Sequence, residues 1–112
     1  MVACIERPAH IPEKQWLERW LRDHRKVAVE TQATFSYVRN RVVTAVTEGA
    51  PGWAGIVEEG FEAEAVTNPM LWYRAEGSQE KLQANLARML ESVGAFLDLE
   101  KVESNPMSEY RF

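Results

Sequence analysis

The chain lacks several features that would place it in a particular class of protein. Cys4 is its only cysteine among 112 residues, so no disulfide can form within the chain and we expect a cytoplasmic location. Its 13 basic residues are outnumbered by 17 acidic ones, for a net charge of −4. Because a nucleic-acid surface must neutralise phosphates, we expect no nucleic-acid partner. The apolar runs are too short to cross a bilayer, so we expect no membrane partner.

Motifs for metal, nucleotide and serine-nucleophile chemistry are also missing. The two histidines, His10 and His24, lie fourteen residues apart, which is not the spacing of a zinc site. The glycines at 49, 52 and 55 form no phosphate-binding loop before a helix, and there is no serine elbow. We therefore expect no metal and no cofactor, with heme on His24 as a less favoured alternative.

What the chain does contain is the composition of one globular domain over residues 1–112. Hydrophobic residues make up 46% and charged residues 27%, which is ordinary for a folded protein. A chain of this length buries about two thirds of the surface that its unfolded form exposes, which is enough for one modest core.

Its most informative pattern is Trp16, Trp20 and His24, each four residues after the last. At about 3.6 residues per turn, these side chains share one face of a helix. The same face is widened by the apolar residues Leu17, Leu21, Val27 and Ala28. Histidine titrates near neutrality, so His24 is either a buried structural residue or the working group of a small apolar pocket.

Turn signals and hydrophobic periodicity divide the rest of the chain into strands and helices. The predicted strands are 1–7, 35–46, 53–61 and 107–112, and the predicted helices are 12–30, 69 to about 77, and a long one after the Ser78 cap. This order is that of a ferredoxin-like βαββαβ fold, an α+β architecture with a four-stranded antiparallel sheet and helices on one face. Strand 35–46 is apolar on both faces, so we expect its second face to meet another copy of the chain in a two-fold dimer.

Four segments resemble the EthD-like proteins of the dimeric α+β barrel superfamily. Residues 16–24 resemble that family's helix with tryptophans and a histidine, and residues 37–40, Tyr-Val-Arg-Asn, are similar to its Tyr-x-x-Asn strand. Residues 57–61, Val-Glu-Glu-Gly-Phe, resemble its third strand, and residues 108–110, Ser-Glu-Tyr, its polar tripeptide in the last strand. The resemblance covers nearly the whole chain and agrees with the element order.

This resemblance implies a homodimer whose two sheets face one another, with a pocket between sheet and helices in each protomer. The wider superfamily includes cofactor-free monooxygenases, decarboxylases and lactone isomerases, so the fold alone does not fix the reaction.

Two pairs of strand residues are candidates for polar contacts with a ligand. Tyr37 and Asn40 have an odd separation, so they fall on opposite faces of their strand. Glu58 and Glu59 also alternate, so one of them points inward or into the dimer interface, and an inward carboxylate must be paired or protonated. An ion pair with one of the predicted strand arginines, Arg39, Arg41 or Arg111, is somewhat favoured there over a catalytic carboxylate.

From the helix pattern and the resemblance we predict cofactor-independent chemistry on a small hydrophobic compound, such as an aromatic or polyketide-like one. The reaction would be of oxidoreductase, decarboxylase or isomerase type, in which His24 moves a proton while Tyr37 or Glu58 orients the polar end. The other predicted ligand contacts are Trp16, Trp20, Asn40, Phe61 and Tyr110. The alternative is a non-catalytic binding or accessory protein that serves an oxygenase pathway.

Overall fold

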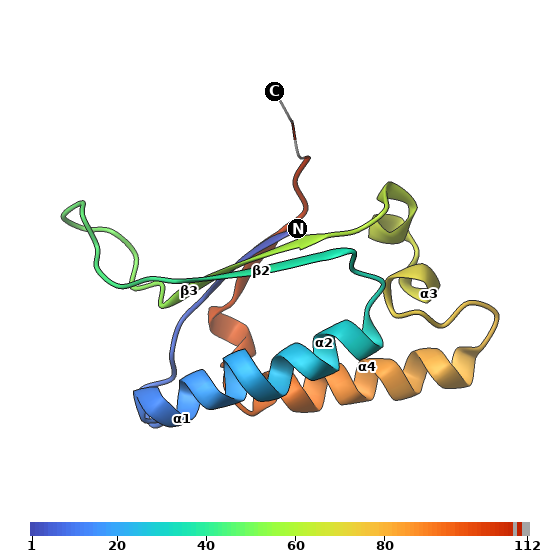
Figure 1. Cartoon of the computed structure of the whole chain (residues 1–112), viewed down its shortest axis with the longest axis horizontal. Helices are drawn as coiled ribbons and strands as arrows, with labels where there is room; N and C mark the ends of the chain where they lie inside the picture. Colours follow the sequence, from blue (N-terminus) through green and yellow to red (C-terminus); the bar gives the residue numbers. More distant parts are fainter. Residues whose placement is uncertain (109, 111–112) are drawn as a thin grey trace.

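The computed structural model describes residues 1–108 and 110, and shows a four-stranded antiparallel sheet with helices on one side (Figure 1). The strands are β1 Val2–Ile5, β2 Ser36–Arg41, β3 Gly55–Gly60 and β4 Glu103–Asn105, in the spatial order β2-β3-β1-β4. This confirms the predicted α+β class and is consistent with a ferredoxin-like fold. Within the described residues, no helix is both long and apolar enough to cross a membrane.

The first helical region is continuous and carries the predicted aromatic pattern. It consists of α1 Glu13–Leu17, a π-helical segment η1 Glu18–His24, and α2 Arg25–Thr31, close to the predicted 12–30. Trp16, Trp20 and His24 are all buried, which confirms that they lie on its core-facing side.

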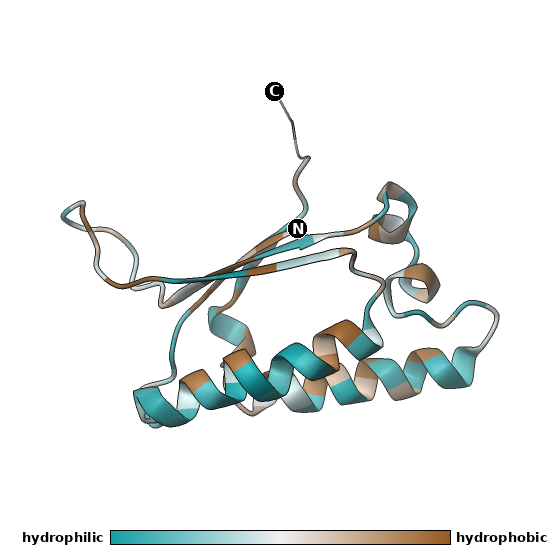
Figure 2. Cartoon of the chain, in the orientation of Figure 1, coloured by the Kyte–Doolittle hydropathy of each residue, from teal (hydrophilic) through white to brown (hydrophobic). Residues whose placement is uncertain are grey.

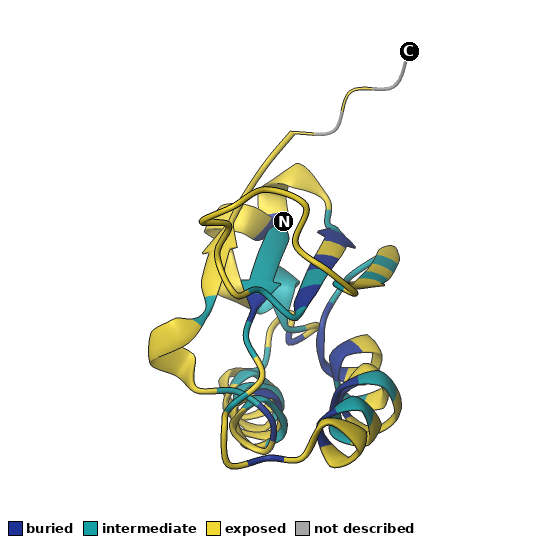
Figure 3. Ribbon diagram, turned by 90° about the vertical axis from the view of Figure 1, so that its left-hand side faces the viewer, coloured by how far each residue is buried: buried dark blue, intermediate teal, exposed yellow. Residues whose placement is uncertain are grey.

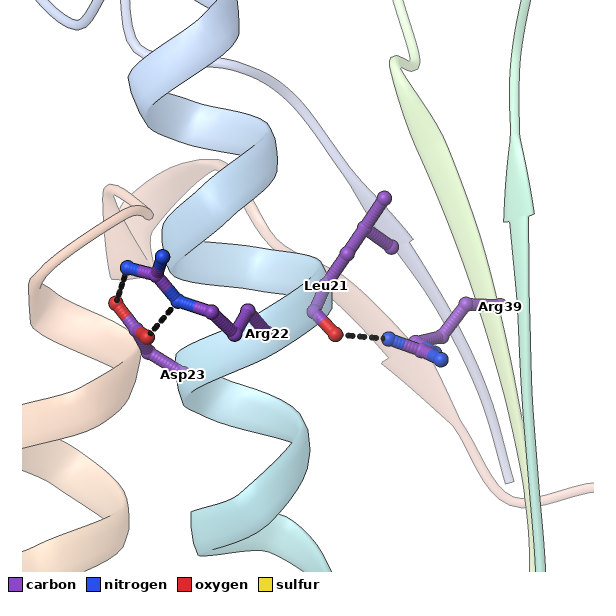
Figure 4. A network of polar contacts seen from close by, with 4 residues as sticks. All are labelled: Leu21, Arg22, Asp23 and Arg39. Atoms are coloured by element: carbon purple, nitrogen blue, oxygen red, sulfur yellow. Dashed lines mark hydrogen bonds and ion pairs between the residues drawn. The ribbon is translucent and has the colours of Figure 1, made fainter.

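A hydrogen bond ties the π-helical segment to the sheet. Arg39 of β2 extends toward the helix, where its Nη1 donates to the Leu21 carbonyl over 2.6 Å (Figure 4). π-Helical turns, which are wider than α-helical turns, often occur at functional sites. On the same segment, Arg22 and Asp23 form an exposed ion pair, a type of contact that adds little stability.

The second long helix, α4 Gln79–Gly94, packs beside α2 on the same side of the sheet (Figure 1). The Ser78 hydroxyl accepts a hydrogen bond from the Lys81 amide over 3.1 Å, so the predicted cap is confirmed.

Shorter helical turns connect β3 to α4 and α4 to β4: η2 Ala63–Thr67, α3 Pro69–Trp72 and η3 Leu99–Lys101. The predicted start of α3 is confirmed, because the Asn68 side chain accepts from the Met70 amide. The helix stops earlier than expected, since Arg74 adopts a left-handed φ of 51° well before Gly77.

The core lies between the sheet and the two long helical regions. Figure 3 shows buried residues where these layers face each other, and Figure 2 shows hydrophilic residues along the outer helix surfaces. The Trp16 indole Nε1 donates to the Phe96 carbonyl over 2.9 Å, which links the first helix to the segment after α4. The largest fully buried side chains are Trp16, Trp20, Phe96 and Thr31.

β2 is shorter than the predicted strand 35–46. It ends at Arg41, and the valines beyond it project into solvent, with Val43 88% and Val46 94% exposed. The segment that would have to pair with them contains glycine or proline at positions 49, 51 and 52, and these residues are poor strand formers. The pairing of β2 with β3 therefore ends at Arg41, before the predicted end of the strand, and β3 begins at residue 55 rather than 53.

The last strand also differs from the prediction of residues 107–112. β4 occupies Glu103–Asn105, where it pairs with β1. Pro106 follows at once, and proline has no N–H to continue a ladder. Residues 107, 108 and 110 are not in a strand, while residues 109, 111 and 112 lie outside the described residues.

Candidate functional site

A cavity of about 320 Å³ lies between the helix-facing side of the sheet and the helices, which is within the range of small-molecule sites. Its apolar walls include Trp20, Val57, Met89, Val93 and Phe96. Its polar lining includes His24 from η1, Gln32 after α2, Tyr37 from β2, Glu59 from β3 and Tyr73 after α3. Residues from most elements of the fold therefore converge on this hollow.

His24 is held on the helix side of the cavity. Its Nδ1 lies 2.8 Å from the Ser92 hydroxyl of α4, and its ring packs against Phe96 with the ring centroids 4.9 Å apart. Burial lowers the pKa of the imidazole to about 4, because the charged form loses its hydration. The ring is therefore neutral at physiological pH, and Ser92 engages only one of its two nitrogens.

Glu59 is a buried carboxylate on the sheet side, only 7% exposed. Burial raises its pKa to about 7, and the charge of the Met1 ammonium partly opposes this. Among the described residues it forms no salt bridge, so the predicted ion pair is not formed with Arg39 or Arg41. The third predicted partner, Arg111, lies outside the described residues. Arg39 donates to a helix carbonyl instead, and Arg41 pairs with Glu13.

Gln32 joins Glu59 to Trp72. The indole N–H of Trp72 can only donate, so we assign the Gln32 amide with its oxygen toward Trp72, at 3.2 Å, and its nitrogen toward Glu59 Oε1, at 2.9 Å. Phe61 stacks on the Trp72 ring with centroids 3.6 Å apart. Trp72 therefore donates to Gln32, and Gln32 donates to the Glu59 carboxylate.

Two tyrosines near Glu59 complete the polar lining. Tyr37 is its direct partner in the β2–β3 ladder; burial, and to a smaller extent the Glu59 charge, raises the Tyr37 pKa to about 12. The same two causes raise the pKa of Tyr73. Trp20 also lines the cavity, and its buried N–H has no hydrogen-bond partner within residues 1–108 and 110.

The structure brings together only part of the predicted site. His24, Tyr37 and Trp20 line the cavity. Glu58 and Asn40 lie on the open face of the sheet, where the Asn40 amide donates to a Glu58 carboxylate oxygen over 2.9 Å. The predicted opposition of Tyr37 to Asn40 and of Glu58 to its neighbour Glu59 is therefore confirmed.

The remaining predicted contacts lie outside the cavity lining. Trp16 is part of the core, Phe61 lines a smaller neighbouring hollow with Trp72, and Tyr110 is 78% exposed.

Sequence reasoning considered the pair Glu58 and Glu59 but assigned the role to Glu58, and it did not single out Gln32. Side chains alternate along a strand, so one of the two adjacent glutamates must point inward. Because the two preceding residues, Ile56 and Val57, are both apolar, the sequence does not show which glutamate that is. Gln32 lies just past the end of α2 and belongs to no motif. Its contact with Glu59 depends on a strand more than twenty residues further along the chain, and no local pattern encodes that.

Comparison of the chain with protein-family models, with curated proteins and with solved structures finds no significant match. The resemblance to EthD-like proteins therefore stays a prediction from sequence motifs. Within the described part of the chain, no group of three or more His, Cys, Asp or Glu residues is placed to hold a metal ion. The function must be inferred from the chemistry of the cavity itself.

Proposed function

We propose that the protein carries out cofactor-independent proton-transfer chemistry on a small hydrophobic compound held in this cavity. The main support is the convergence of His24, Tyr37 and Glu59 on a largely apolar hollow. Ligand sites typically combine apolar walls with a few polar groups whose pKa values are displaced.

In this proposal His24 moves the proton and the sheet residues hold the polar end of the compound. The neutral imidazole can accept a proton at Nε2 while Nδ1 engages Ser92. Glu59 takes the role that the sequence suggested for Glu58, and Tyr37 donates its hydroxyl beside it. A proton taken from one position of the compound and returned at another is an isomerisation, which needs no oxidant or other co-reactant.

We also propose that the open face of the sheet pairs with a second copy, as in the dimeric barrel of EthD-like proteins. Val38 is 47% exposed on this face, and Val2, Cys4 and Ile56 are only partly buried there. Val2 and Val38 also line a hollow of about 380 Å³ together with Met107. Two sheets packed face to face would remove this apolar surface from water.

The second candidate function is a non-catalytic cytoplasmic protein that binds a hydrophobic compound for an oxygenase pathway. The hydrogen bond between His24 and Ser92 favours this alternative, because a histidine held by its neighbours can be purely structural. The two candidates differ in whether the bound compound is changed.

Ligand-observed NMR with a panel of small aromatic and aliphatic compounds, followed by product analysis of each binder, tests the proposal. We expect at least one binder to be converted, and His24→Ala to abolish conversion while binding persists. Binding without conversion by the wild-type protein would favour the accessory role. The absence of any binder would contradict both candidates.

A further inference from the structure

Among the described side chains, Glu59 has no positively charged partner. The cavity lining within the described residues contains no lysine or arginine side chain. The nearby Met1 ammonium donates to the backbone carbonyl of Glu59, over 2.8 Å, rather than to its carboxylate. The charge of this ammonium offsets only part of the effect of burial on the Glu59 pKa. Because an incompletely compensated buried carboxylate costs free energy, a positively charged occupant of the cavity would be stabilised there.

The hydrogen bonds around Glu59 prepare it to accept rather than to donate. Trp72 donates to the Gln32 oxygen, which turns the Gln32 nitrogen toward Glu59 Oε1. A donor aimed at a carboxyl oxygen favours the ionised form of the group. An occupant that meets the second oxygen of the ionised carboxylate must therefore bring a hydrogen-bond donor of its own.

We propose that the occupant of the cavity presents a protonated amine to the Glu59 carboxylate and its apolar body to the surrounding rings. This inference rests on the proposed function of the cavity and adds the chemical class of its ligand, a small hydrophobic organic amine. The rings of Trp20, Tyr37 and Phe96 line the same hollow, and aromatic faces attract organic cations. A neutral alcohol would satisfy the hydrogen bond but leave the charge uncompensated.

The other described titratable side chains that line the cavity with Glu59 keep one charge state between about pH 5 and pH 8. The Met1 ammonium also acts on Glu59, and it is bound to the Glu59 backbone carbonyl. His24 of η1 stays neutral above its pKa of about 4, and Tyr37 of β2 stays neutral below its pKa of about 12. Burial raises the pKa of Tyr73 above its ordinary value, so this residue is neutral too. Protonation of Glu59 is then the change that removes amine binding, and amine affinity should fall by about tenfold for each pH unit below the Glu59 midpoint.

Isothermal titration calorimetry of the full chain with benzylamine, benzyl alcohol and benzaldehyde tests the ligand class, because these probes share one ring and differ in the polar end. We expect benzylamine to bind most tightly at about pH 8 and to lose at least about tenfold in affinity at about pH 5, with the neutral probes nearly unaffected. Equal or tighter binding of a neutral probe at the higher pH would overturn the proposal that the ligand is an amine. Benzylamine binding that does not depend on pH would overturn it too. In both cases the cavity would remain a ligand site. Binding of none of the three would overturn both this inference and the proposed function.

Two variants locate the effect. Glu59→Gln removes the charge at almost constant shape, and should weaken benzylamine binding by at least about tenfold at about pH 8 while benzyl alcohol still binds. Glu64→Gln is the matched control, since Glu64 is exposed in η2 and does not line the cavity. Unchanged benzylamine affinity in Glu59→Gln would overturn the inference, and retained alcohol binding shows that the variant is folded.

Discussion

Glu58 and Glu59 are consecutive residues of β3 whose carboxylates lie on opposite sides of the sheet. Glu58 is exposed beside Asn40 on the open face, whereas Glu59 is 7% exposed and lines the cavity. A strand alternates its side chains between two faces, so a shift of one residue in the β2–β3 register would exchange their environments. The candidate site therefore depends on the register of one strand.

Glu59 and His24 should oppose each other in the pH dependence of stability. The pKa of Glu59 is raised in the folded protein, so its contribution is present at low pH and is lost as the pH rises from about 4.5 to about 7. The pKa of His24 is lowered, so its contribution is present above about 6.5 and is lost as the pH falls toward about 4. Over the shared range the two slopes largely cancel in the wild-type protein.

Replacing either Glu59 or His24 should leave the pH dependence of stability that the other residue produces. Glu59→Gln should become more stable with rising pH, and His24→Gln less stable, by up to about 1.4 kcal/mol per pH unit between about pH 4.5 and pH 6.5. Urea unfolding across this range measures both slopes. Identical pH profiles for the wild-type protein and Glu59→Gln would show that the carboxylate is not perturbed by folding.

The two core tryptophans should respond differently to removal of the indole N–H. Trp16→Phe leaves the buried Phe96 carbonyl without its donor, whereas the Trp20 N–H has no partner in the described structure to lose. We expect Trp16→Phe to cost about 1 kcal/mol more than Trp20→Phe in the free energy of unfolding, for similar losses of ring volume. Equal costs in chemical denaturation would argue against a stabilising role for the Trp16 hydrogen bond.

Gly55 should be required for the close approach of β3 to the first helix. A Cβ at this position would overlap the Trp20 ring, while one at Gly52 meets nothing within 4 Å. Gly55→Ala should destabilise the protein by on the order of 2 kcal/mol through overpacking, and Gly52→Ala should have little effect. The difference in their urea midpoints is the measurement, and indistinguishable midpoints would contradict the packing described for Trp20.

The proposed dimer can be tested by placing a charge on the open face. Val38→Lys puts an ammonium beside Glu58, its neighbour in the β2–β3 ladder, so the single chain should stay folded while two facing sheets separate. Native mass spectrometry should show about two chains of 12.8 kDa for the wild-type protein and one for the variant. A wild-type monomer would contradict the proposed pairing, and an intact variant dimer would place the interface elsewhere.

Features set by local patterns were predictable from the sequence. The buried face with Trp16, Trp20 and His24 follows from spacing, and the Ser78 cap from residue type. Features that depend on distant partners were not predictable. The end of β2 depends on the residues of the segment that would pair with it. The inward direction of the Glu59 side chain depends on which side of the sheet the helices cover.

The most direct test of the account is a ¹³C NMR pH titration of the Glu59 carboxyl carbon in protein labelled at glutamate. Glu59→Gln assigns the signal by its disappearance. A buried carboxylate whose described surroundings contain no cationic side chain should titrate with a midpoint near pH 7, and the midpoint should fall when benzylamine binds. A midpoint at the value of about 4.3 found for glutamate in a peptide, unchanged by the amine, would contradict the assignment of Glu59 to the site.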